Sequence, residues 1–173
     1  MSKQQRETID QMLRHGALDL GSEVDEQRRL FADLLSAVPL PGDVRTEEAA
    51  LGDVPVVTIS VDGTTPTGTI LYFHGGAYAL GSAALSAGLA SELARRSSAR
   101  AMSVDFALAP ERPYPAALHD AVAAYQALLD GGIPANDIVV AGESSGGGLA
   151  LATTLTIIST GLPRPAAVYV ASP

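Results

Sequence analysis

The chain has 173 residues, 47% hydrophobic and 17% charged, which allows one globular domain with a sizeable core and excludes intrinsic disorder. Its net charge of −8 argues against nucleic-acid and anionic-membrane partners, because both attract basic surfaces. Cysteine is absent, which excludes a disulfide framework and a thiolate metal site. The polar N-terminus has no apolar signal core and no segment is long and apolar enough to cross a membrane, so we expect a cytoplasmic protein.

The first part of the chain is predicted to be helical. Apolar residues recur at helical spacing through residues 1–38. The segment Val38-Pro39-Leu40-Pro41-Gly42 then breaks the pattern and reads as a connector. We therefore expect a helical segment over residues 1–40 and a separate core over residues 41–173.

From about residue 44 the predicted elements alternate between strand and helix. Strands are expected at 54–61, 69–73, 101–105, 138–141 and 167–171, and helices at 83–96, 116–129 and 145–159. This alternation predicts an α/β fold with a largely parallel sheet that is covered by helices on both faces.

A G-x-S-x-G motif follows the fourth of these strands and precedes an apolar helical segment. This context is typical of a nucleophile elbow, a sharp strand-to-helix turn that lifts a serine off the end of the sheet. Gly142 and Gly146 let the strand and the helix approach each other without Cβ clashes. The motif selects Ser144 as the nucleophile, because Ser145 would need a glycine where Glu143 stands.

A second glycine motif, at Gly75 and Gly76, follows another apolar strand. Acyl transfer passes through a tetrahedral oxyanion, which needs preorganised donors, and glycines leave backbone N–H groups unshielded. We predict that the N–H groups of Gly75, Gly76 and Ser145 form this oxyanion hole. The alternative is that the glycine pair forms only a tight turn. Two glycine motifs, each placed after a strand, favour the oxyanion hole.

Three blocks of sequence resemble the bacterial hormone-sensitive-lipase-like esterases (family IV), which have the α/β-hydrolase fold. The blocks are HGGAY at 74–78, similar to the family's HGGGY; DFALAPERPYPAA at 105–117, similar to DYRLAPEHPFPAA; and GESSGG at 142–147, similar to GDSAGG. The resemblance implies a three-layer sandwich with an N-terminal helical cap over the acyl pocket. It also implies hydrolysis of small-molecule esters with short to medium acyl chains, without a cofactor or metal, by a protein that could be a homodimer at full length.

Four further residues are expected to have structural roles near Ser144. His74 is expected to brace the oxyanion loop by hydrogen bonding, and Glu143 to support the same site. Asp105, together with Glu111, is expected to hold the loop 106–115. Two aromatic residues, Tyr78 and Tyr114, are candidates to line the acyl pocket, although an aromatic side chain after a turn more often serves packing.

Two departures from the family pattern lead to further expectations. Ala77 replaces a glycine and should restrict the backbone to negative φ while leaving its N–H available. No His, Asp or Glu follows Ser144, although the family places its acid and its histidine there. We therefore expect a fragment or truncated form that lacks the C-terminal strands and helices, with Val168 and Val170 on an exposed apolar edge.

The histidines of the chain do not supply the missing base. His119 and Asp120 are adjacent on a predicted helix and point about 100° apart, so they cannot pair directly. His15 lies at the end of the first predicted helix, where a cation suits the helix dipole. We assign no base from these residues.

Three functions from different classes remain open. The first is a serine esterase that forms an acyl-enzyme on Ser144, and lactone hydrolysis passes through the same intermediate. The second is a ligand-binding member of the fold without catalysis. The third is a chain that functions only when assembled with another chain. The glycines at 146–148 also suggest a phosphate site, but the lysine and the spacing of phosphate-binding loops are missing.

Overall fold

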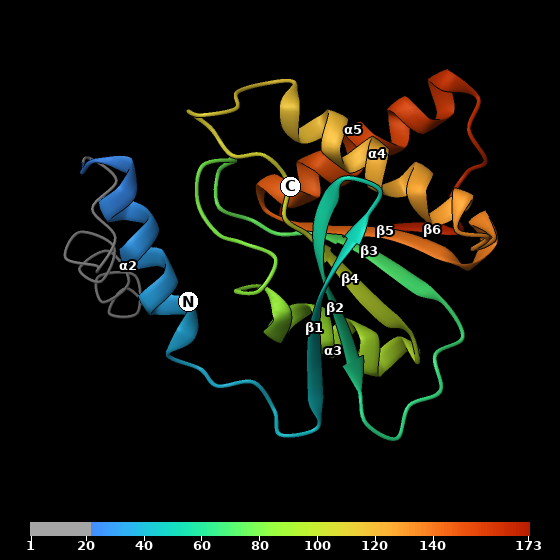
Figure 1. Cartoon of the computed structure of the whole chain (residues 1–173), viewed down its shortest axis with the longest axis horizontal. Coiled ribbons are helices and arrows are strands. Elements are labelled where there is room, and N and C mark those ends of the chain that lie inside the picture. The colour runs from blue at the N-terminus through green and yellow to red at the C-terminus, as the bar shows by residue number, and fades with distance from the viewer. Residues whose placement is uncertain (1–21) are drawn as a thin grey trace, which may run out of the picture.

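The computed structural model describes residues 22–173, so the expectations for residues 1–21, including His15, lie outside it. Helix α2 (Val24–Ser36) stands apart from the sheet (Figure 1) and has no buried residue. Residues 37–43 contain neither helix nor strand, and they lead into the first strand of the core. The predicted N-terminal helix is thus present over α2, and the predicted connector follows it.

Six strands form a single sheet in the order β1-β2-β4-β3-β5-β6. They are β1 (Val44–Leu51), β2 (Val54–Val61), β3 (Thr69–Phe73), β4 (Arg100–Val104), β5 (Ile138–Glu143) and β6 (Ala167–Ala171). Strands β4, β3, β5 and β6 are parallel, whereas β1 and β2 form an antiparallel hairpin that pairs with β4. The prediction of a largely parallel sheet is confirmed.

Helices cover both faces of this sheet and make a three-layer α/β fold (Figure 1). Helix α3 (Ala87–Ser97) packs on one face, and α4 (Ala116–Asp130) and α5 (Ser145–Thr160) pack on the other. Helix α3 turns a stripe of small buried residues towards the sheet, formed by Ala87, Ala90 and Ala94. A short 3-10 helix, Ala135–Asp137, leads into β5. No helix within residues 22–173 is long and apolar enough to cross a membrane.

Two neighbouring strands bring the predicted site residues to one edge of the sheet. Strands β3 and β5 are parallel neighbours, and Phe73 is in register with Gly142. The segments that follow these strands therefore leave the sheet side by side at its carboxyl edge, where α/β proteins place their sites. Strand β6 pairs with the other edge of β5, away from β3, and is the last strand of the sheet. In β6, Val168 and Tyr169 are exposed and Val170 is half-buried.

Candidate active site

Ser144 lies at the junction of β5 and α5 with a strained backbone. Its φ of 52° and ψ of −128° are rarely adopted by a residue other than glycine. The turn is held by a 2.8 Å hydrogen bond from its N–H to the carbonyl of Ala171. The residue is exposed, so the bend presents the serine at the surface instead of burying it.

The glycines around Ser144 permit the tight packing of this turn. A Cβ at Gly142 would overlap the carbonyl oxygen of Gly146, so strand and helix approach more closely than any side chain allows. The prediction that Gly142 and Gly146 allow a close approach of strand and helix is confirmed. Gly75 also lies against Ser144, because a Cβ there would lie 3.1 Å from the Cβ of Ser144.

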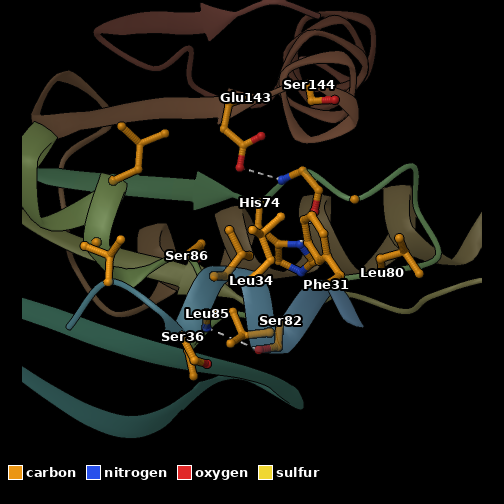
Figure 2. Close-up of a pocket in the computed structure, with 18 of the residues that line it drawn as sticks. Phe31, Leu34, Ser36, His74, Leu80, Ser82, Leu85, Ser86, Glu143 and Ser144 are labelled. Carbon is orange, nitrogen blue, oxygen red and sulfur yellow. Dashed lines mark hydrogen bonds between the residues drawn. The ribbon is translucent and has the colours of Figure 1, made fainter. Parts of the chain in front are cut away.

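The Gly75 amide, one of the three predicted oxyanion donors, already has a partner. Its N–H donates a 2.7 Å hydrogen bond to Oε1 of Glu143 (Figure 2). The same oxygen accepts a bond of 3.3 Å from the Tyr72 hydroxyl. Within residues 22–173, the N–H groups of Gly76 and Ser145 have no hydrogen-bond partner. The donors that remain available are therefore those of Gly76 and Ser145.

Glu143 connects the two loops of the site. Burial and the neighbouring carboxylate of Glu143 both raise the pKa of Tyr72, so its hydroxyl stays protonated and donates. Glu143 thus receives one hydrogen bond from strand β3 and one from the loop that follows it. These two bonds tie the end of β5 to β3 and to the loop after it, and the supporting role of Glu143 in the site stays a prediction.

The expectation that Ala77 would adopt a negative φ is wrong. Ala77 and Tyr78 have φ values of 55° and 60°, and Gly76 has 122°. The turn closes because the N–H groups of Ala79 and Leu80 both donate to the Gly76 carbonyl, at 3.0 and 2.8 Å. These bonds and the packing around the turn hold Ala77 in a conformation that its methyl group disfavours.

His74 is buried at the base of this loop. Its Nδ1 donates to the carbonyl of Gly75 at 2.7 Å, and its ring stacks on Phe106 with the centroids 4.4 Å apart. Burial lowers the pKa of His74 below its ordinary value of 6.5, so the ring is neutral at physiological pH. These contacts are those of a bracing residue. Neither His74 nor His119 bonds to Ser144 within the described part of the chain.

The loop 106–115 is held by a hydrogen bond to α4, whereas the Asp105 carboxylate bonds to a different segment. The Asp105 carboxylate accepts the N–H of Ala83, at 3.0 Å, and so fixes a turn before α3. Asp120 of α4 instead accepts the N–H of Ala107 at 2.9 Å. The contact expected of Asp105 is therefore corrected, because its carboxylate faces the segment that precedes α3.

Two ion pairs that the sequence did not predict link the same loop to other elements. Arg28 of α2 pairs with Glu111 at 2.8 Å, and Arg112 pairs with Asp120 at 3.3 Å. Sequence reasoning missed Arg28 because it lies in a charged helical segment beside Arg29, and nothing in that pattern distinguishes the two. Only the tertiary fold shows that one arginine reaches across to the core.

A cavity of about 980 Å³ opens beside Ser144. Helix α2 and the connector line one side, and the glycine loop, the turn before α3 and the start of α3 line the other. Figure 2 shows Phe31 and Leu34 of α2 below the glycine loop and Ser144 above it. Tyr78 and Tyr114 do not line this cavity: Tyr78 packs against Phe106, and Tyr114 is 88% exposed.

Known proteins share this architecture. A family model described as alpha/beta hydrolase fold matches residues 70–173. The chain is 44% identical to an acetyl-hydrolase of Streptomyces hygroscopicus, over 61% of this chain and 35% of that protein. It is 40% identical to an esterase of Acinetobacter venetianus, over 62% of this chain and 35% of the relative.

Solved structures agree with these relatives. A hormone-sensitive lipase from a metagenome library superposes with a TM-score of 0.87 at 37% identity, over 98% of this chain and 57% of that one. An esterase of the bacterial hormone-sensitive lipase family gives a TM-score of 0.87 at 34% identity, with the same coverage. The chain thus spans less than two thirds of the length of each of these four proteins. From the matched residues and the superposed fold, the chain belongs to the α/β-hydrolase family, in its hormone-sensitive-lipase-like branch.

Proposed function

We propose that the protein is a serine hydrolase that cleaves carboxylic esters through an acyl-enzyme on Ser144. The observation that carries the proposal is the meeting of two loops at one sheet edge. An exposed serine on a strained turn lies against the glycine loop, whose Gly75 leaves no room for a side chain. Nucleophile and amide donors in contact are what acyl transfer requires.

In the proposed reaction the hydroxyl of Ser144 gives its proton to an acceptor from outside residues 22–173 as its oxygen attacks the ester carbonyl. The tetrahedral intermediate then collapses, and the leaving alkoxide takes up that proton and departs as the alcohol. The negative charge on the carbonyl oxygen is held by the N–H groups of Gly76 and Ser145. Ser145 begins helix α5, so its N–H also carries the positive end of the helix dipole. Water then hydrolyses the acyl-enzyme and restores the serine.

The proposal requires a proton acceptor and an acid from outside residues 22–173. Within that range no histidine nitrogen bonds to the Ser144 hydroxyl, and His74 is engaged with Gly75. Loss of a triad member lowers the rate by roughly 10⁴- to 10⁶-fold. Activity is therefore expected from a chain or assembly that supplies the histidine and the acid.

The cavity beside Ser144 supports the proposal that the acyl group of the substrate has short to medium length. Its walls are largely apolar, and helix α2 contributes Phe31, Leu34 and Leu35 to them. We propose that the segment 1–40 acts as the cap of this pocket. Similarity to an esterase supports an ester substrate, and similarity to an acetyl-hydrolase supports a small acyl group.

The test is hydrolysis of p-nitrophenyl esters from acetate to decanoate by the full-length protein and by Ser144→Ala. The parent should favour the shorter esters, and Ser144→Ala should lose activity by about 10⁴-fold or more. Ser159→Ala is the control, because Ser159 lies on the same helix with an exposed side chain. Unchanged turnover in Ser144→Ala would contradict the proposal.

A further inference from the structure

Arg28 of helix α2 reaches across to two backbone carbonyls of the core. Its Nε donates to the carbonyl of Ala79 at 2.8 Å, and its Nη2 donates to that of Ala109 at 3.0 Å. These acceptors belong to separate loops, the glycine turn after β3 and the loop after β4. One side chain therefore joins helix α2 to both loops.

The same guanidinium is held in place by Glu111. Both terminal nitrogens of Arg28 donate to the Glu111 carboxylate at 2.8 Å, in a bidentate pair. Arg28 holds the pKa of Glu111 at about 2, well below its ordinary value. The carboxylate is thus charged at any physiological pH, and it fixes the plane of the guanidinium.

The Ala79 carbonyl is part of the turn that presents the Gly76 amide. The N–H groups of Ala79 and Leu80 both donate to the Gly76 carbonyl. The N–H of Ala109 donates to the carbonyl of Tyr78 at 2.8 Å, which ties the same turn to the second loop. Arg28 bonds to the turn at Ala79 and to the second loop at Ala109, which are the two segments that this hydrogen bond joins. Arg28 therefore restrains the turn from outside the sheet.

Helix α2 also forms a wall of the cavity beside Ser144. Phe31 and Leu35 follow Arg28 by one and two helical turns, and both line the cavity. No residue of α2 is buried, and within residues 22–173 the hydrogen bonds of Arg28 join α2 to the core. The Arg28 contacts therefore restrain the cavity wall together with the oxyanion turn.

We propose that Arg28 is a positioning residue for ester hydrolysis, which aligns the Gly76 turn and the α2 wall of the pocket as one unit. This inference rests on the proposed function. Arg28 does not line the cavity, so it acts through the backbone that it holds. Its side chain is 27% exposed and that of Glu111 is 57% exposed, so the pair adds little to overall stability. Its effect is on geometry.

Lysine cannot take over this role. Arg28 uses Nε and both terminal nitrogens on acceptors that lie in different directions, whereas lysine offers one compact ammonium group. Arg29 provides the matched control on the same helix. Among residues 22–173, its guanidinium bonds to Glu26 and Asp33, both on α2.

The experiment compares Arg28→Ala, Arg28→Lys and Arg29→Ala in the full-length protein by hydrogen–deuterium exchange and by kinetics. For Arg28→Ala we expect faster exchange in peptides covering 76–80 and 106–112, while Arg29→Ala exchanges like the parent. We also expect kcat for p-nitrophenyl acetate to fall by roughly 10- to 100-fold, because the oxyanion donors are misplaced. Arg28→Lys should recover only a small part of this loss.

The acetyl ester separates positioning from simple tethering of α2. If Arg28 only tethered the helix, KM for long acyl esters would rise while kcat for the acetyl ester stayed constant. That result, or exchange over 76–80 equal to that of Arg29→Ala, would overturn the inference. Should Arg28→Ala fail to fold, Arg28→Lys and Glu111→Gln provide the same readouts. Absence of turnover in the parent would instead defeat the proposed function, and the exchange would still report on the link between α2 and the turn.

Discussion

Glu143 and Gly75 are joined by a 2.7 Å hydrogen bond between the residue that precedes the nucleophile and the loop that faces it. Gly75 is buried, so removal of the carboxylate would leave its N–H without an acceptor. We predict that Glu143→Ala lowers the free energy of unfolding by about 1–3 kcal/mol. Glu143→Gln keeps an acceptor oxygen and should lose less. Urea denaturation measures both, and a Glu143→Ala variant as stable as the parent would contradict the bracing role.

Gly146 packs so closely on the end of β3 that no side chain fits. A Cβ at this position would overlap the carbonyl oxygens of Phe73 and His74, which are backbone atoms and cannot swing aside. We expect Gly146→Ala to destabilise the protein by at least about 2 kcal/mol.

Gly148→Ala is the matched control on the same helix. The nearest atom to its Cβ would be the Tyr78 hydroxyl at 3.2 Å, at the end of a side chain that can move. This substitution should be neutral or should stabilise the helix by up to about 1 kcal/mol. Equal thermal stability of the two variants would show that the close approach at Gly146 is not needed.

The positive φ of Ala77 predicts a stabilising substitution. Glycine adopts φ near 55° without the Cβ penalty, so Ala77→Gly should raise the free energy of unfolding by about 0.5 to 1 kcal/mol. Ala79→Gly, two residues later and without a positive φ, should give no gain. Chemical denaturation of both variants tests the prediction. A loss of stability in Ala77→Gly would mean that the turn tolerates alanine without strain.

The free energy of unfolding is expected to depend on pH through the buried His74 ring. Burial lowers its pKa in the folded state, whereas the unfolded chain has the ordinary value of 6.5. Protons therefore favour the unfolded chain: the contribution of the neutral ring is complete above pH 6.5 and is lost as the pH falls below it. NMR titration of the His74 ring should give a midpoint below 6.5, with a matching decline of the urea midpoint. A midpoint at or above 6.5 would contradict this assignment.

Most of the fold could be predicted from the chain. The strand 167–171 agrees with β6, and the helix 116–129 agrees with α4 to within one residue, because apolar periodicity and flanking Gly and Pro mark them clearly. Helix α3 begins at Ala87, later than the predicted residue 83, since turns occupy residues 83–86. Strand β1 was not among the expected strands; it pairs with β2 across the Gly52-Asp53 turn, and no local pattern specifies the antiparallel pairing of β2 with β4.

The site was less accessible to sequence reasoning. The motifs predict Ser144 and the glycine loop as the site, because close backbone packing requires glycines at fixed places. Two contacts could not be predicted: the bond from the Gly75 N–H to Glu143, and the bond from Arg28 to the Ala79 carbonyl. Each joins residues that are tens of positions apart, and each depends on the direction in which a side chain points. The left-handed turn at Ala77 was missed because a local steric rule was overridden by two hydrogen bonds to Gly76. Such outcomes are decided by tertiary structure.

The most direct test of the account is covalent labelling of the full-length protein with a fluorophosphonate, followed by peptide mass spectrometry. An activated serine beside an oxyanion hole is phosphonylated at its hydroxyl. We predict one adduct, on Ser144, with loss of ester turnover in proportion to labelling. An adduct on another residue, or ester turnover that persists after Ser144 is fully labelled, would contradict the account.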